Sequence, residues 1–140
     1  MKILLPVDGS VHTKSMLSYI AAHDELLGAG NEFVFFHAIA PVPQHAARFL
    51  DRKALDGYYA EEAEAVFRPL IAFAEQQGWQ FRTAHAVGHA VRAIADVCAT
   101  EKPDLIVMGT HGHSALANVI LGSVATGVLA CCKPPVLLVR

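Results

Sequence analysis

Five short apolar runs alternate with longer amphipathic stretches along this chain of 140 residues. The runs cover residues 2–7, 33–40, 80–86, 105–109 and 135–139, and all but the third are continuous segments rich in Val, Ile, Leu and Phe. Continuous apolar strands are typical of a sheet that is covered on both of its faces. The pattern therefore predicts five strands buried between two layers of helices.

Helical patterns separate these runs, at residues 13–27, 59–77, 91–100 and 123–132. In the second of them apolar side chains recur at three- and four-residue steps, and Gly78 follows as a natural stop. Strands that alternate with helices form βαβ units with right-handed crossovers and parallel strands. We therefore expect an α/β fold, a five-stranded open parallel sheet of the Rossmann-like type, in one domain over residues 1–140.

Residues 41–57 interrupt this alternation. They carry two prolines, mixed charge and a patchy apolar pattern. The segment is expected to be a loop with one short helix, and a flap over a ligand crevice is one interpretation of it.

The fourth apolar run leads into a spaced set of glycines: Gly109, Gly112 and Gly122, the last followed by Ser123. Neither the P-loop pattern nor the dinucleotide fingerprint is present. Glycines after a buried strand let a ligand approach the backbone, and a helix that starts at Gly122, with Ser123 as its N-cap, would offer N–H groups and a hydroxyl to phosphate. Nucleotide binding is the leading hypothesis.

The first strand ends in a second turn signal, residues 6–10. Ligands of open parallel sheets bind beyond the carboxyl ends of the strands, so both turns are expected to line one crevice. Asp8 in this turn is ordinary turn chemistry, but its place at a strand end favours a functional role. His37, inside an apolar strand, is expected to be a hydrogen-bonded core residue.

Composition argues against several classes of protein. The formal net charge is −2 and the Lys and Arg residues are scattered, which favours neither nucleic acid nor a membrane surface as partner. No apolar stretch is long enough to span a bilayer, and the first run is too short for a signal peptide. Cys98, Cys131 and Cys132 are odd in number and include an adjacent pair, so free thiols are expected. These features predict a soluble cytoplasmic protein.

Histidines raise the question of a metal site. His111 and His113 lie two residues apart, and His12 or His45 could join them in binding a transition metal. No Cys or carboxylate shares the tight spacing, so no metal site formed by the protein itself is predicted.

Further motifs are found along the chain besides the glycine spacing: residues 3–10 (ILLPVDGS), residues 36–38 (FHA) and residues 134–139 (PPVLLV). Together these segments resemble the ATP-binding branch of the universal stress protein family, and the resemblance spans essentially the whole chain. It implies an adenine nucleotide alpha hydrolase-like fold, in agreement with the pattern above. It also implies an adenine and ribose site at Pro6, Val7 and Asp8, with Asp8 accepting hydrogen bonds and Ala38 bordering the adenine. The ribose and first phosphates would lie against Met108, Gly109, His111 and Gly112, and the phosphate tail against Gly122, Ser123, Val124 and Ala125.

One departure from the family concerns charge. Many members carry basic residues just after the second glycine, whereas residues 113–118 contain no Lys or Arg. Triphosphate binding would then depend on backbone dipoles, hydroxyls, protonated His111 or His113, and a divalent ion such as Mg²⁺ or Mn²⁺ bound with the nucleotide. ATP is the expected ligand, and AMP and ADP are expected competitors.

Three classes of function remain open at this stage. The first is a small stress-response protein that acts as a nucleotide-dependent regulatory module; the alternatives are a slow ATPase, and an interaction protein with a vestigial pocket. No catalytic residue is predicted, because phosphoryl transfer needs several positive groups around the reacting phosphate. The final apolar run, from Pro135 to Val139, is expected to be an exposed edge that pairs with a second copy in a homodimer, as the family resemblance also implies.

Overall fold

A single five-stranded sheet forms the centre of the structure, a computed structural model that describes residues 1–113 and 120–140. Its strands stand in the order β3-β2-β1-β4-β5, and every neighbouring pair is parallel. The strands are β1 (Lys2–Pro6), β2 (Glu32–Ile39), β3 (Gln80–Val87), β4 (Leu105–Gly109) and β5 (Val136–Val139). The predicted fold class is confirmed.

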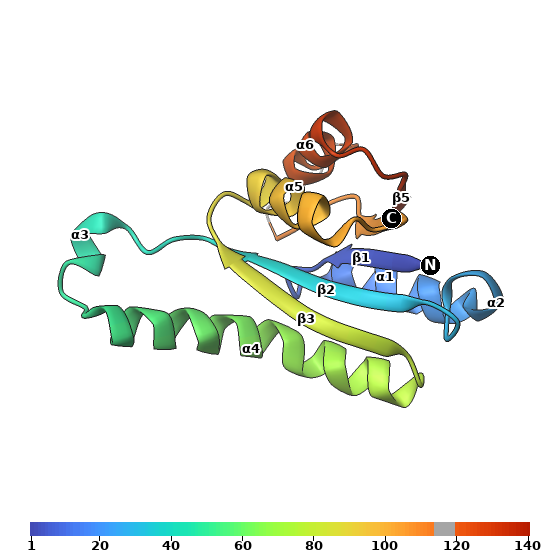
Figure 1. The fold of residues 1–140 in the computed structure, drawn as a ribbon, viewed down its shortest axis with the longest axis horizontal. Coiled ribbons are helices and arrows are strands. Elements are labelled where there is room, and N and C mark those ends of the chain that lie inside the picture. Colours follow the sequence, from blue (N-terminus) through green and yellow to red (C-terminus); the bar gives the residue numbers. More distant parts are fainter. Residues whose placement is uncertain (114–119) are drawn as a thin grey trace.

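Helices cover both faces of this sheet, α1 and α4 on one side and α5 and α6 on the other (Figure 1). The helices are α1 (Val11–Ala22), α2 (Asp24–Leu27), α3 (Gln44–Ala47), α4 (Arg52–Gln76), α5 (Ala90–Glu101) and α6 (Ser123–Cys131). Within the described ranges, no helix combines the length and the apolar character that crossing a membrane requires.

Two hydrophobic cores follow from the alternation of side chains along each strand. Ile3 and Leu5 of β1 point toward α1 and α4, where they meet Met16 and Phe67, whereas Leu4 points toward α5 and α6. Successive side chains of a strand face opposite sides, so a continuous apolar run fills both cores at once. This is why the apolar runs of the sequence show no alternation.

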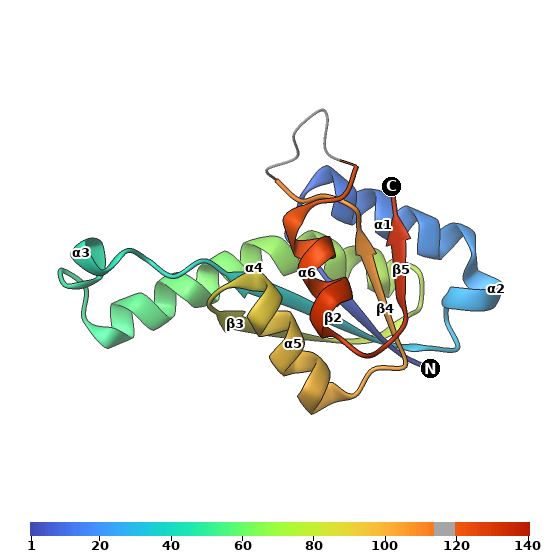
Figure 2. The ribbon, with the colours of Figure 1, turned by 90° about the horizontal axis from the view of Figure 1, so that it is seen from above.

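Two helix boundaries differ from the sequence-based expectation. The helix predicted over residues 13–27 is divided at His23 into α1 and α2, and α4 begins at Arg52 rather than at residue 59. The expected short helix exists as α3, but residues 52–57 of the predicted loop belong to α4. Asp51 starts that helix, because its carboxylate accepts a hydrogen bond from the N–H of Ala54 at 2.7 Å. In Figures 1 and 2, α3 and the first turns of α4 extend past the carboxyl ends of β2 and β3.

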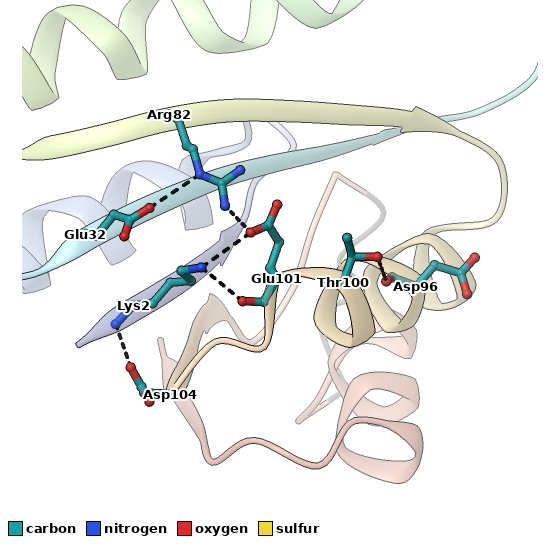
Figure 3. Close-up of polar contacts among 7 residues, drawn as sticks. All are labelled: Lys2, Glu32, Arg82, Asp96, Thr100, Glu101 and Asp104. Atoms are coloured by element: carbon teal, nitrogen blue, oxygen red, sulfur yellow. Dashed lines mark hydrogen bonds and ion pairs between the residues drawn. The ribbon is translucent and has the colours of Figure 1, made fainter.

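A cluster of ion pairs joins the strands at their amino ends (Figure 3). Arg82 of β3 pairs with Glu101 at the end of α5 and with Glu32 at 3.4 Å, and Lys2 lies 3.7 Å from the Glu101 carboxylate. The backbone N–H of Lys2 also donates to Asp104 at 2.7 Å. The hydrogen bond from Arg82, together with the charges of Arg82 and Lys2, lowers the pKa of Glu101. These contacts lie at the amino ends of the strands, whereas the site described next lies at their carboxyl ends.

Candidate functional site at the carboxyl ends of the strands

A cavity of about 850 Å³ opens where β1, β2 and β4 end. The structure brings all twelve predicted site residues together around it: Pro6, Val7, Asp8, Ala38, Met108, Gly109, His111, Gly112, Gly122, Ser123, Val124 and Ala125. They come from three strand ends and from α6. Their roles in binding stay predictions, but their convergence follows from the parallel sheet, because the carboxyl ends of its strands share one edge.

The cavity is mainly apolar where it meets the sheet. Val7, Phe36 and Met108 line it from the ends of β1, β2 and β4, and Ile94 and Ala125 line it from α5 and α6. All five are buried in the two cores. An apolar wall that is part of a packed core is rigid and suits a flat hydrophobic ring.

Asp8 orders the turn that leads into α1. Its Oδ1 accepts hydrogen bonds from the N–H of Ser10 and the hydroxyl of Thr13, both at 2.9 Å, and Gly9 at φ +75° reverses the chain between them. Burial by itself raises the pKa of Asp8, but the donors of Ser10 and Thr13 and the nearby His113 outweigh it, so the pKa is lowered. Asp8 therefore caps its turn and presents an ionised carboxylate to the cavity.

The glycines of the motif lie where neighbouring segments pack closely. A Cβ on Gly109 would lie 2.9 Å from the Cβ of His12, and one on Gly112 would lie 2.6 Å from Oδ2 of Asp8. A Cβ on Gly122 would lie 3.0 Å from the carbonyl oxygen of Thr110. The glycine spacing thus lets α1, the Asp8 turn and the start of α6 approach the loop after β4.

The start of α6 differs in one detail from the prediction. Gly122 is the N-cap, and Ser123 is the first helical residue. Gly122 is held by a 2.7 Å hydrogen bond from its N–H to the carbonyl of Thr110. The first N–H groups of a helix have no partner within the helix, so those of Ser123, Val124 and Ala125 are available where these residues line the cavity.

Two histidines bind consecutive carbonyl oxygens at the end of β1. His37 of β2 donates from Nδ1 to the carbonyl of Val7 at 2.8 Å, and His113 donates from Nε2 to the carbonyl of Asp8 at 2.6 Å. His37 is hydrogen-bonded within the core, as predicted, but it also lines the cavity. Among the described residues, no group of three His, Cys, Asp or Glu side chains could hold a metal ion.

Sequence reasoning missed several residues of the cavity: Thr13, Phe36, Ala40, Ala90, Ile94 and Thr110. Two of these residues could have been predicted from their place in the sequence. Ala90 and Ile94 open the helix that follows β3, and the start of a helix after a parallel strand lies at the carboxyl edge. Thr13 could not have been predicted in this way, because its hydroxyl reaches Asp8 only through the turn around Gly9.

The fold and the cavity define a doubly wound α/β protein with a ligand-sized site at the carboxyl ends of its strands. Residues 1–140 match the model of the universal stress protein family, and the chain belongs to this family. It is 34% identical over 140 residues to a universal stress protein of Thermus aquaticus, covering 99% of this chain and 97% of the relative. Some relatives are longer, and the chain spans 42% of the universal stress protein Slr1230 of Synechocystis sp..

Solved structures show the same fold. Protein MJ0577 of Methanocaldococcus jannaschii superimposes with a TM-score of 0.81 at 28% identity, covering 99% of this chain and 94% of the other. Universal stress protein UspA of Lactobacillus plantarum has a TM-score of 0.82 at 21% identity and covers 100% and 97%.

Proposed function

We propose that this protein binds an adenine nucleotide in the cavity and acts as a nucleotide-dependent regulatory module in the stress response. The observation that carries the proposal is the contrast between the two sides of the cavity. An apolar wall lies on the side of the sheet, and closely packed glycines and the start of α6 lie on the other side. A volume of about 850 Å³ is within the range of small-molecule sites, about 300–1,000 Å³. The free thiols of Cys98, Cys131 and Cys132 suit a reducing compartment such as the cytoplasm.

The proposed pose places the base against the apolar wall. Val7 and Ala38 flank the adenine and ribose, and Pro6 closes that end. The ionised carboxylate of Asp8 has only acceptors, and it accepts hydrogen bonds from ribose hydroxyls. The phosphates lie against Gly122 and the first turn of α6, where backbone N–H groups and the helix dipole attract an anion.

Structures of the same fold give independent support. Universal stress proteins have been solved in complex with cAMP (TM-score 0.66, 22% identity) and, from Archaeoglobus fulgidus, with dAMP (0.70, 19%). A family member from Arabidopsis thaliana was solved with AMP bound (0.72, 10%). At these identities the likeness is one of fold, so the proposal for this chain depends on its own residues. We propose ATP as the ligand, with ADP and AMP as competitors.

A divalent ion would enter with the nucleotide. Asp8 is the one carboxylate among the described residues of the cavity, and its Oδ1 already accepts two hydrogen bonds. Mg²⁺ is commonly held by substrate phosphates and water with few protein ligands. Phosphate oxygens are therefore the proposed ligands of Mg²⁺ or Mn²⁺.

Binding without rapid hydrolysis is the activity that fits this cavity best. Phosphoryl transfer needs positive groups around the phosphate and a residue that positions the nucleophile. The described lining residues include no Lys or Arg, and residues 114–119 contain neither. We expect ATP turnover far below the range of about 1–100 per second of kinases. A turnover in that range, retained through further purification, would refute the binding-module proposal in favour of an enzyme.

The test of nucleotide binding begins with freshly purified protein. Denaturation should release an adenine nucleotide, identified by chromatography and mass spectrometry, and calorimetry should show binding of ATP or AMP. Ala38→Leu places a larger side chain at the adenine end and should weaken this binding. Ala60→Leu, on an exposed turn of α4, is the matched control. Protein that releases no nucleotide and takes up none would point to the vestigial pocket.

We also propose a homodimer through the strand that runs from Pro135 to Val139. β5 is an edge strand. The carbonyls of Pro135 and Val139 accept hydrogen bonds from Ile106 and Thr110, so by the alternation along a strand Val136 and Leu138 present their backbone groups to the free edge. An antiparallel copy would pair with these groups.

Leu138→Pro tests this interface because it removes an outward donor and leaves the inward hydrogen bonds to β4. Light scattering should report a dimer for the parent chain and a monomer for the variant. A variant that stays dimeric with unchanged circular dichroism would place the interface elsewhere.

A further inference from the structure

The basic side chains among the described residues of the cavity are all histidines. Its described lining residues include one carboxylate, Asp8, three imidazoles, those of His37, His111 and His113, and no Lys or Arg. The sequence of residues 114–119 contains no ionisable side chain. A nucleotide polyphosphate placed at the start of α6 would therefore meet imidazoles where a basic loop would supply permanent cations.

The hydrogen bonds of His37 and His113 each use one ring nitrogen and leave the other to accept a proton. A carbonyl oxygen only accepts, so the ring nitrogens that donate to Val7 and Asp8 already carry hydrogen. In His113 the remaining nitrogen is Nδ1, and in His37 it is Nε2. Protonation of that nitrogen therefore charges each ring without breaking its hydrogen bond to Val7 or Asp8, which follow β1.

His12 couples this set to α1. Its ring centroid lies 5.4 Å from that of His111, whose Nδ1 is 3.1 Å from the Thr110 hydroxyl. Two positively charged rings at this distance would repel each other. A phosphate beside them offsets that repulsion, so anion binding and proton uptake favour each other.

Apart from histidines, the charged groups nearby keep the same charge between pH 5.5 and 8.5. Asp8 has a lowered pKa and stays ionised there. Outside the lining are Lys14 on α1, Arg92 with the titratable His89 at the start of α5, the Glu64–Arg68 pair on α4, and Arg140 after β5, all exposed. α6 has no charged side chain. The histidines are thus the groups that can change the charge of the cavity between pH 5.5 and 8.5.

We infer that His111 and His113, with His12 in ring contact, make nucleotide phosphate binding proton-coupled, so that the affinity for a nucleotide polyphosphate falls as pH rises. The inference rests on the proposed function. A histidine whose pKa rises by one unit on contact with phosphate strengthens binding by at most about tenfold. Because the pKa is raised in the complex, the gain is complete below the pKa of the free histidine and is lost as pH rises through that of the bound form.

The experiment compares ATP with adenosine by calorimetry at pH 5.5, 7 and 8.5. ATP affinity should fall by about tenfold or more toward pH 8.5, with net proton uptake seen in buffers of different ionisation enthalpy, whereas adenosine affinity should change little. If neither ligand binds at any pH, the proposed function fails. If both bind with the same pH profile, the function stands and the inference is overturned.

Variants separate the histidines from the phosphates, which themselves titrate near pH 6. His113→Lys installs a permanent charge and should strengthen ATP binding at pH 8.5 and flatten the profile. The double variant His111→Gln, His113→Gln should remove the proton uptake. His23→Gln, at the far end of α1, is the matched control and should keep the parent profile. A double variant that keeps the parent profile and proton uptake overturns the inference.

Discussion

Gly122→Ala tests whether the contact between the start of α6 and the end of β4 sets the geometry of the proposed phosphate site. The new Cβ would lie 3.0 Å from the carbonyl oxygen of Thr110 and 3.3 Å from Cα of His111. Both are backbone atoms, which cannot rotate away. Gly122 has φ −68° and ψ 160°, a conformation that alanine also adopts, so the expected effect is steric.

The size of this effect follows from two opposing terms. Overpacking costs about 1–3 kcal/mol, and replacing glycine by alanine in an allowed conformation returns about 0.4–1 kcal/mol through the unfolded state. A net loss of about 1–2 kcal/mol should lower the unfolding temperature by about 3–8 °C. Because α6 must move by a few tenths of an ångström, its first N–H groups should also move, and ATP binding should weaken by about tenfold, which is about 1.4 kcal/mol.

Thermal unfolding and calorimetry with ATP measure the two effects separately. Gly30→Ala is the matched control, because a Cβ at that position has no atom within 4 Å. The reasoning is refuted if Gly122→Ala unfolds at the parent temperature and binds ATP with the parent affinity. In that case the hydrogen bond between Gly122 and Thr110 would not constrain the helix.

Three further predictions concern stability and pH. Gly57→Ala, inside α4 with open space around the new Cβ, should raise the free energy of unfolding by about 0.5–1 kcal/mol in urea titrations, and an unchanged midpoint would contradict it. Glu101→Gln should remove ion pairs with Arg82 and Lys2, lower the free energy of unfolding by at most about 1 kcal/mol, and leave ATP affinity unchanged, because the pairs lie at the amino end of the sheet. A loss of nucleotide binding in that variant would show that the amino and carboxyl ends of the sheet are coupled. Asp8→Asn should destabilise the fold at pH 7, and the difference from the parent should shrink as pH falls below 3.8: the pKa of Asp8 is lowered, so its stabilising contribution is complete above this usual value and is lost as pH falls through the folded-state pKa. Chemical unfolding across the acid range measures this difference, and a gap that does not shrink as pH falls below 3.8 would contradict an ionic origin.

Hydrophobic patterns were sufficient to predict the fold class, whereas the twelve predicted site residues came from the resemblance to the universal stress protein family, and they are only part of the lining of the cavity. Apolar runs such as β1 face two cores, and that double burial is visible as a run without alternation. The predicted site residues converge because each lies at or just after the carboxyl end of a strand or at the start of α6, and the carboxyl ends of the strands lie on the same side of any parallel sheet. Helix boundaries were harder to predict. Glycine disfavours helices, so Gly57 argued against a helix that begins before it, although Asp51 is an N-cap signal.

The sequence by itself determined which residues are apolar, where the chain can turn, and which strand ends carry polar groups, because these depend on local chemistry. Only the tertiary structure decided that β1 lies beside β4, which brings the Asp8 turn against Gly112. It also decided which ring nitrogens of His37 and His113 are engaged and that His12 contacts His111. Those relations join residues up to 105 positions apart, and they arise from how the helices pack on the sheet, which no local pattern records.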